Sequence, residues 1–493
     1  MNTTSRRDFL KLAGLGAAFF LPRRCSGQAR VGKSAGLSFQ SLETSGGRKP
    51  NILLIVADDL GWADVGWHGS KFQTPVLDRL VKEGIELDRH YVQPVCTPTR
   101  TALMSGRWTS RFGPHVLMPS NSRAFPPGTP ILASALKQCG YTTHLSGKWH
   151  LGGKAEWGPN HYGFDHSYGA LCGAVDPWTH KYRRGAFEDT WHRDLQRVDE
   201  EGNATELVAK EVLPWIKQAH KPWFIYVPFF AVHIPVDAPE EYKRRYAGVK
   251  FHDDPVKHDS LLRLAAYVNQ LDTKVGEFIA ALEATGQRDN TFVIFTSDNG
   301  GLPGGNNPYV GKVKDSPMLS SNLPLRGHKN TLYEGGVRVS AFINWPGRLK
   351  PGKLAVPLHA ADWMPTLTKL AGWTPPADLK FDGLDIWPLL TGAVTKPEPR
   401  TIYIPHASGA IVLRDGWKLI ARKGGNAKKK KAAAAAVVEL YNVTADPYEE
   451  KDLAQAEPKK VQELQAILVE LRRDDLAKMP PDAGDGAVDQ ADK

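Results

Sequence analysis

Two pairs of oxygen-bearing side chains stand directly after apolar runs in this sequence. Asp58 and Asp59 follow the run NILLIVA. Asp298 and Asn299 follow the run TFVIFTS. Either pair alone would also fit a helix cap or a turn, but adjacent carboxylates repel one another unless a cation lies between them. Because ligands of open α/β sheets gather beyond the carboxyl ends of strands, the two pairs together predict a site for a hard cation such as calcium or magnesium rather than zinc.

Lysines and histidines follow other strand-like runs in the same way. Lys148 and His150 come after YTTHLS, and His233 lies just beyond WFIYVPF. Lys329 lies beside a glycine-rich turn in LRGHKNTLYEGGVRVS. A lone histidine in either place would more often be structural. Together with a divalent cation, however, these groups would bind a small dianion-like group, neutralise its oxygens and transfer protons.

Cys96 stands alone in YVQPVCTPTR, just ahead of a predicted helix. A zinc or disulfide motif would need a second cysteine two to four residues away, and none is there. Thr97 can cap the helix and Pro98 can occupy its first turn, so backbone N–H groups would favour an anion or a thiolate. With Arg100 beside it, Cys96 is therefore a candidate nucleophile.

The elements that would position these residues alternate between strands and helices. Buried strands are predicted at 51–57, 223–229, 291–297 and 339–345, and helices at 74–84, 129–140, 205–219, 259–285 and 361–371. This alternation predicts a layered α/β domain with a large, mostly parallel central sheet. We expect this main domain, which would carry the site, to span residues 50–395.

The pattern changes after about residue 395. Short strands flank a hairpin signal at Asp415–Gly416, and a closing helix is predicted at 457–474. These features predict a small C-terminal α+β subdomain with an antiparallel sheet at 396–476. The lysine- and alanine-rich segment 424–436 reads as a solvated hairpin loop, and 477–493 as a disordered tail.

The first 29 residues resemble an export signal. Arg6 and Arg7 precede an apolar stretch at 12–21 that is too short to span a bilayer, as in bacterial twin-arginine signals. We expect cleavage after Ala29 and a linker at 30–49. The signal predicts the twin-arginine translocase as a partner, a periplasmic or secreted location, and no stable membrane insertion.

Charge and cysteine content narrow the class of protein. The formal charge is +10, and the leader contributes five basic residues and one acidic one, a net +4, which leaves +6. That bias suits a polyanionic substrate, but without a concentrated basic stripe we expect no nucleic-acid binding. If cleavage of the leader removes Cys25 and the reaction uses Cys96, then Cys139 and Cys172 remain, either bonded to each other or not.

The motifs around these residues resemble the type I, formylglycine-dependent sulfatase family. CTPTR followed by TALMSGR resembles its signature C-x-P-x-R, whose cysteine a formylglycine-generating enzyme converts to formylglycine. NILLIVADDLGWADVGWHGS, GYTTHLSGKWHLG, FTSDNGG and LRGHKNTLYEGGVRVS resemble its other blocks in the same order. The resemblance covers about residues 50–455 and is greatest to the arylsulfatase B, or N-acetylgalactosamine-4-sulfatase, branch. It implies an alkaline-phosphatase-like sandwich fold.

The resemblance also implies a calcium site and a nucleophile. The calcium ligands would be Asp58, Asp59, Asp298, Asn299 and an oxygen of the modified Cys96. Arg100 would stabilise the formylglycine hydrate, which would attack sulfur and form a covalent sulfo-enzyme intermediate. Thr99 stands where the family most often has serine.

The remaining roles concern the substrate, a sulfated glycan or an aryl sulfate. Lys148 and Lys329 would hold the sulfate oxygens. His233 would protonate the leaving oxygen, and His150 would help to remove a proton from the second hydroxyl so that sulfate is expelled. Segment 169–185 varies with substrate in the family, which makes its Trp178 and His180 candidate pocket residues.

Three other readings compete with this one. A phosphomonoester or phosphonate hydrolase could use the same scaffold, since sulfate and phosphate esters share a tetrahedral shape. A non-catalytic protein that binds sulfated glycans would keep Cys96 unmodified, but it would have no need of proton donors. A redox enzyme is disfavoured, because no G-x-G-x-x-G follows a strand and no C-x-x-C pair is present.

Overall fold

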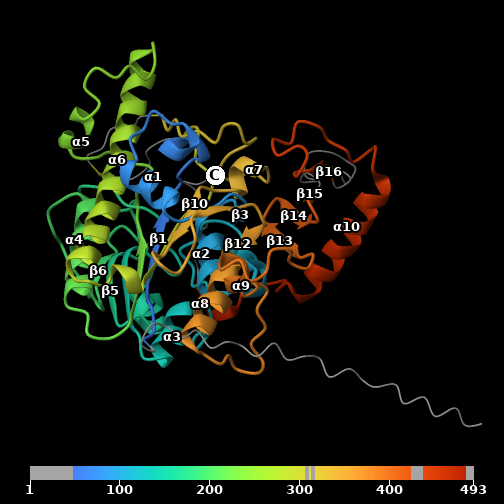
Figure 1. Ribbon diagram of the computed structural model, residues 1–493, viewed down its shortest axis with the longest axis horizontal. Coiled ribbons are helices and arrows are strands. Elements are labelled where there is room, and N and C mark those ends of the chain that lie inside the picture. Colours follow the sequence, from blue (N-terminus) through green and yellow to red (C-terminus); the bar gives the residue numbers. More distant parts are fainter. Residues whose placement is uncertain (1–47, 306–309, 312–316, 424–436, 485–493) are drawn as a thin grey trace, which may run out of the picture. The chain divides into compact units, whose positions relative to one another are not determined.

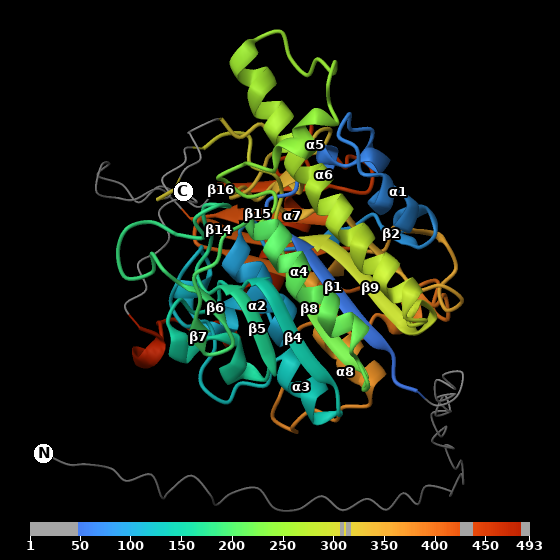
Figure 2. The same ribbon diagram turned by 90° about the vertical axis from the view of Figure 1, so that its left-hand side faces the viewer.

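The computed structural model describes residues 48–305, 310–311, 317–423 and 437–484. The expected export signal, the linker up to residue 47, the loop 424–436 and the last nine residues of the expected tail lie outside the described residues. Arg48 and the residues after it form one compact unit, drawn from two directions in Figures 1 and 2.

Within the described residues the central sheet has ten strands, in the order β11–β2–β10–β9–β1–β8–β4–β5–β6–β7. In chain order they are β1 (Asn51–Ala57), β2 (Ile85–Leu87), β4 (Thr142–Lys148), β5 (His166–Ala170), β6 (Trp191–Arg193), β7 (Gln196–Arg197), β8 (Trp223–Pro228), β9 (Thr291–Ser297), β10 (Ala341–Asn344) and β11 (Gly352–Leu354). The five central strands β9, β1, β8, β4 and β5 are parallel to one another, which confirms the predicted, mostly parallel sheet. Strand β10, predicted at 339–345, runs antiparallel to β9.

Helices cover both faces of this sheet. The side chains of β1 alternate between these faces and so contribute to two apolar cores. Leu53 and Ile55 pack with α1 (Pro75–Lys82), α4 (Ala204–Lys217) and α6 (Pro255–Ala284). Leu54 and Val56 pack with α2 (Cys96–Ser105), α3 (Leu132–Gln138) and α8 (Trp363–Ala371). Figure 2 shows α4 and α6 crossing one face of the sheet. The result is the expected sandwich of helices around a sheet.

Shorter elements complete the main domain. They are the two-stranded parallel sheet of β3 (His90–Tyr91) and β12 (Leu358–His359), and the short helices α5 (Glu240–Arg244), α7 (Glu334–Val337) and α9 (Trp387–Leu390). Among the described residues no helix combines the length and the apolar character needed to cross a membrane.

The C-terminal subdomain is the predicted antiparallel sheet with one covering helix. Its strands are β13 (Thr401–His406), β14 (Gly409–Arg414), β15 (Trp417–Arg422) and β16 (Val437–Asn442), and its helix is α10 (Pro458–Leu471). Asp415 and Gly416 both have positive φ, at 51° and 78°, as a two-residue hairpin turn of this kind requires. One face of the sheet packs on α10 and the other packs on the main domain.

Part of the expected disordered tail is ordered. Pro481–Ala483 form a 3₁₀ turn, and Ala483 is buried. Arg123 donates its backbone N–H to the Ala483 carbonyl at 3.0 Å, and its guanidinium pairs with Asp482. Cys139 and Cys172 are not joined to each other by a disulfide.

Buried neutral histidines should make the fold sensitive to acid. Burial lowers the pKa of these side chains from about 6.5 to about 4 or below: His90, His144, His192, His359 and His406. Between pH 6.5 and 4 the unfolded chain therefore binds protons that the folded chain does not, so stability falls as the pH falls. We expect the melting temperature to drop steadily across this range, measured by circular dichroism.

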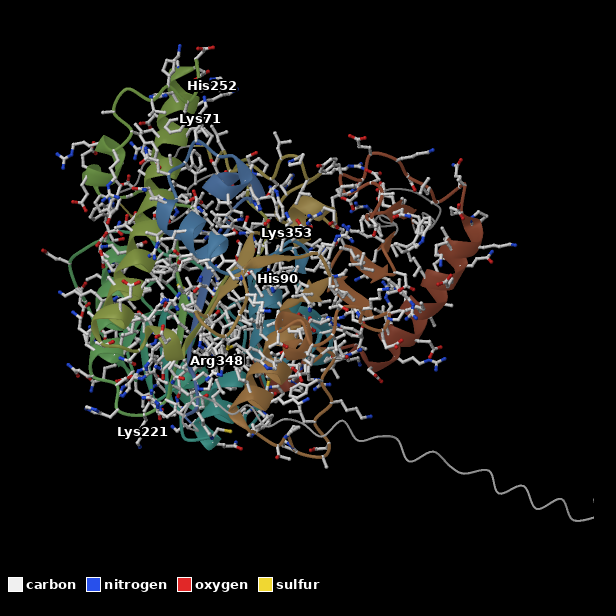
Figure 3. All side chains as sticks on the ribbon, viewed as in Figure 1. Lys71, His90, Lys221, His252, Arg348 and Lys353 are labelled. Atoms are coloured by element: carbon white, nitrogen blue, oxygen red, sulfur yellow. The ribbon has the colours of Figure 1, made fainter. Side chains whose placement is uncertain are left out.

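A matched pair of variants isolates this effect. Figure 3 labels both residues: His90 is fully buried, whereas His252 is exposed and lies just before the start of α6. Replacing the buried His90 by glutamine should flatten the dependence of melting temperature on pH, because one protonation is removed from the unfolded state. The exposed His252→Gln should leave the slope as it was. An unchanged slope in His90→Gln would contradict the explanation.

Candidate active site

The strand-end residues singled out in the sequence meet at one edge of the sheet. Strands β1, β8 and β9 are parallel and in register, with Ala57 opposite Ser297, so Asp58 and Asp298 begin neighbouring turns. Lys148 ends β4 on the same edge, since β4 is parallel to β8. Cys96 is the first residue of α2, which packs on one face of the sheet. All of these side chains are buried.

Asp58 is the contact point between the cysteine and the basic residues. Lys148 donates to its carboxylate at 2.6 Å, the Cys96 thiol donates at 3.5 Å, and Arg100 lies at 3.7 Å. Burial and the nearby Asp298 raise the pKa of Asp58 to about 6, against the opposing charges of Lys148, His233 and Arg100. A carboxylate in this setting gains from a further positive charge.

Arg100 is fixed on Asp298. Its Nε and Nη2 atoms donate to the same oxygen of Asp298 at 3.0 and 2.7 Å, and Nη1 donates to the Lys148 carbonyl at 3.1 Å. Burial alone would raise the pKa of Asp298, but Arg100 and the two lysines outweigh burial and hold it below its ordinary value. The pair ties α2 to the end of β9.

Asp59 contacts the remaining polar side chains of the site. Its backbone lies in the left-handed region, at φ 60°, which aspartate tolerates better than most residues. Its carboxylate accepts from Asn299 Nδ2 at 2.7 Å and from Lys329 Nζ at 3.0 Å, and His233 Nε2 lies at 3.7 Å. The Oδ1 atom of Asn299 is buried and accepts no hydrogen bond from the described residues.

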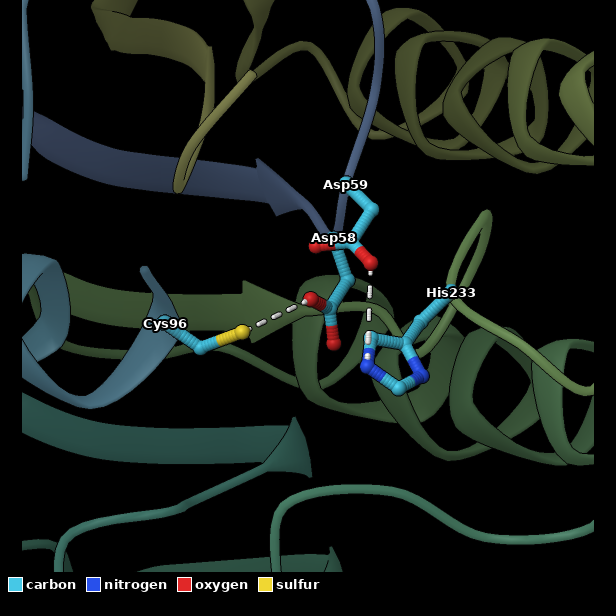
Figure 4. Close-up of side chains that lie close together, drawn as sticks. All are labelled: Asp58, Asp59, Cys96 and His233. Carbon is cyan, nitrogen blue, oxygen red and sulfur yellow. Dashed lines mark hydrogen bonds and ion pairs between the residues drawn. The ribbon is translucent and has the colours of Figure 1, made fainter. Parts of the chain in front are cut away.

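These side chains fit a hard cation. Ligand atoms of Asp58, Asp59, Cys96 and His233 all lie within 4.8 Å of one another (Figure 4). Asp298 adjoins this group by accepting from the Asp59 backbone N–H, and Asn299 adjoins it by donating through Nδ2 to the Asp59 carboxylate. An orphaned amide oxygen beside three carboxylates is the arrangement that an oxygen-preferring cation would complete. The position of His233 inside the group was not predicted from the sequence.

The environment of Cys96 contradicts one sequence-based expectation. Its thiol is fully buried, and burial together with the charge of Asp298 raises the pKa of the thiol well above its usual value, despite the opposing lysines. Burial and the neighbouring carboxylate therefore disfavour a thiolate at this helix start. Unmodified Cys96 would be a weak nucleophile. Thr97, expected as the cap, instead accepts from the Ser120 backbone N–H at 3.0 Å.

Thr99 makes the contacts that a serine hydroxyl would make. Its Oγ1 accepts from the Gln93 backbone N–H at 2.9 Å and donates to the Gln93 carbonyl at 3.1 Å. Both bonds use the hydroxyl alone, so the departure from serine costs the turn nothing.

The two histidines are held by backbone contacts near the site. His150 is buried with φ 54°, and its backbone N–H donates to the Leu171 carbonyl at 3.1 Å. His233 Nδ1 lies 2.5 Å from the Ile234 carbonyl. Because a carbonyl only accepts, Nδ1 carries the proton of this bond and Nε2 points at Asp59.

The two candidate pocket residues differ in role. Trp178 is half-buried, and its indole N–H donates to Asp237 at 2.9 Å. His180 is buried: its Nε2 lies 3.0 Å from the Gly202 carbonyl, and its ring stacks on Trp191 at 4.3 Å.

Sequence reasoning missed one residue that supports the site. Asn322 receives the Gly301 N–H at 2.8 Å and donates to the Gly301 carbonyl at 2.9 Å, which fixes the turn that follows Asn299. It lies 21 residues from Gly301 in a segment with no apolar periodicity, so no local signal identified it.

Comparison with known proteins identifies the family to which this chain belongs. A Sulfatase family model matches residues 50–373. Arylsulfatase J of Mus musculus is 31% identical over 472 residues, covering 85% of this chain and 75% of that protein. N-acetylgalactosamine-6-sulfatase of Mus musculus is 31% identical over 388 residues, covering 74% and 70%. The crystal structure of Ps i-CgsB has a TM-score of 0.73 and 28% identity, covering 88% of this chain and 96% of that one. The chain therefore belongs to the sulfatase family and is a hydrolase of sulfate esters.

Proposed function

We propose that this chain is a calcium-dependent sulfatase that removes sulfate from a sulfated carbohydrate, using a formylglycine made from Cys96 by a formylglycine-generating enzyme. The observation that carries the proposal is the setting of Cys96. Its sulfur is fully buried 3.5 Å from an Asp58 carboxylate oxygen, and in the metal-free protein burial raises the thiol pKa, so the metal-free thiol is a poor nucleophile. A modified side chain at the same position would not need to ionise as a thiol.

The charges of the site suit a sulfate monoester. Asp58, Asp59, Asp298 and Asn299 would hold calcium, which would supply positive charge against the sulfate oxygens. The three carboxylates of that set are matched by Arg100, Lys148 and Lys329, each in contact with at least one of them. The protein's own side chains therefore add no net negative charge that would repel the substrate.

Each basic residue has a role in the proposed reaction. The hydrated formylglycine would supply the hydroxyl that attacks sulfur, and Arg100, fixed on Asp298, would stabilise that hydrate. Lys148 and Lys329 would hold the sulfate oxygens. His233 would protonate the leaving oxygen through Nε2, since its Nδ1 is bonded to the Ile234 carbonyl. His150 would remove a proton so that sulfate is expelled.

Replacing His233 by glutamine should expose its role as an acid. We expect the loss of kcat to depend on the leaving group, because a good leaving group departs without a proton. The loss should be about tenfold with 4-nitrophenyl sulfate and about a thousandfold with a sugar sulfate. Equal losses on the two substrates, measured by initial rates, would contradict the assignment.

A carbohydrate substrate is supported by the similar proteins. One solved structure with 27% identity and a TM-score of 0.73 is that of Ps i-CgsB in complex with k-i-k-neocarrahexaose. One relative is named N-acetylgalactosamine-6-sulfatase. We further propose export by the twin-arginine translocase to the periplasm or beyond, on the strength of Arg6, Arg7 and the short apolar stretch that follows them.

Paired substrates test the proposal. The protein would be purified from its native host, and the tryptic peptide 90–100 weighed to establish the aldehyde at Cys96. We expect such protein to hydrolyse 4-nitrophenyl sulfate at least about a hundredfold faster, by kcat/KM, than 4-nitrophenyl phosphate. A reversed ratio would support the phosphomonoester hydrolase instead. If Cys96 is unmodified and the protein binds sulfated glycans without hydrolysing them, the result would support a non-catalytic glycan-binding protein.

A further inference from the structure

A fully buried charged cluster joins the C-terminal sheet to the main domain. Lys418 of β15, Glu334 of α7 and Glu449 have no exposed surface. Lys418 Nζ lies 2.9 Å from Glu334 and 2.8 Å from Glu449, and the Tyr91 hydroxyl donates to Glu334 at 2.9 Å. Burying three charged groups is costly even when they are paired, so such a cluster is weak evidence for stability alone.

Glu334 begins a helix that packs directly on the active site. The Gly300 N–H donates to the Gly336 carbonyl at 3.2 Å. A Cβ on Gly300 would lie 1.8 Å from the Gly335 carbonyl oxygen, so no side chain fits between α7 and the turn that carries Asp298 and Asn299. Movement of α7 would therefore move that turn.

The segment before α7 carries Lys329 and is fastened on both sides. The Lys329 N–H donates to the Gly301 carbonyl at 3.1 Å, and the next residue, Asn330, donates to the Pro94 carbonyl at 2.7 Å. Arg326, three residues earlier, donates to the Tyr441 hydroxyl at 3.1 Å and to the Glu449 carbonyl at 2.9 Å. The C-terminal subdomain thus contacts this segment at two places: at Arg326, before Lys329 in the chain, and at Glu334, after it.

We propose that Lys418 is a positioning residue for the reaction: by holding Glu334 it keeps the segment 326–334 in place and so aims Lys329 at the substrate sulfate. The inference rests on the proposed function, because it uses the role assigned to Lys329. Strand β15 offers a matched control, since its side chains alternate between two faces. Ile420, like Lys418, faces the main domain, whereas Leu419 packs in the core beneath α10.

A double-mutant cycle on the full chain tests the proposal, with 4-nitrophenyl sulfate as substrate well below the melting temperature. Lys418→Met should lower kcat/KM by about tenfold to a hundredfold, as a displaced catalytic group does. In the Lys329→Ala background the same substitution should cost less than about twofold, because the group it positions is already gone. Leu419→Ala should lower the melting temperature by several degrees and change kcat/KM by less than about twofold.

Equal losses from Lys418→Met in both backgrounds would overturn the proposal. If Lys418→Met does not fold, Tyr91→Phe replaces it in the same cycle, because it removes one bond to Glu334 and keeps the ring. If modified wild-type protein does not hydrolyse sulfate esters, the proposed function fails, and hydrogen exchange of residues 326–338 then tests the positioning alone. Faster exchange in Lys418→Met than in Leu419→Ala would support it, and equal exchange would overturn it.

Discussion

Replacing Cys96 by alanine is expected to lower kcat for aryl sulfate hydrolysis by at least about 10⁴-fold, as removal of an enzyme nucleophile does. The substitution removes only a sulfur atom from a closely packed site, so the free energy of unfolding should change by about 1 kcal/mol. The rate should fall because alanine cannot be converted to the proposed formylglycine nucleophile, and stability should change little because the sulfur, 3.5 Å from an Asp58 oxygen, is not part of a disulfide.

Cys139 provides the matched control for this prediction. It is a half-buried cysteine at the end of α3, and Cys139→Ala should keep wild-type kcat within about twofold. Rates would be compared on protein in which the mass of peptide 90–100 shows conversion of Cys96 to the aldehyde. Activity that persists in Cys96→Ala would rule out this residue as the source of the nucleophile.

The placement of the site along one sheet edge could be predicted from the sequence. Continuous apolar runs identify strands buried on both faces, and parallel strands bring their carboxyl ends together. This reasoning brought Asp58, Lys148 and Asp298 to one place, where the structure has them. The same reasoning extended to His233, because it follows β8 on the same edge.

The finer geometry could not be predicted, because it depends on contacts between distant segments. Nothing in the sequence near Glu334 indicates that Lys418, 84 residues later, would contact it. The expectation of a thiolate at Cys96 failed for a related reason. The helix start is local, but the thiol pKa is raised first by burial in the folded core and then by the carboxylate of Asp298, which comes from a turn about 200 residues away.

Removal of the proposed calcium ion should lower the rate of sulfate ester hydrolysis strongly. Treatment with EGTA is expected to lower kcat by about 10³-fold or more, since a cation at a reacting oxyanion contributes several kcal/mol. Excess calcium should restore the rate and raise the stability of the folded chain by about 2.7 kcal/mol at a concentration of one hundred times Kd. Asp59→Asn should abolish both responses, because Asp59 contacts Asn299, Lys329 and His233.

Asp64 offers a matched carboxylate that should not respond. It is buried five residues beyond Asp59, where burial raises its pKa to about 6 and its oxygens accept from the N–H groups of Gly61 and Ser321. An amide can keep part of that bonding, so Asp64→Asn should lose less than about tenfold in kcat and keep the calcium-dependent rise in melting temperature. Calorimetry of each variant with and without calcium measures this directly. If the calcium-dependent rise in melting temperature persists in Asp59→Asn but disappears in Asp64→Asn, the cation binds outside the site formed by Asp58, Asp59, Asp298 and Asn299.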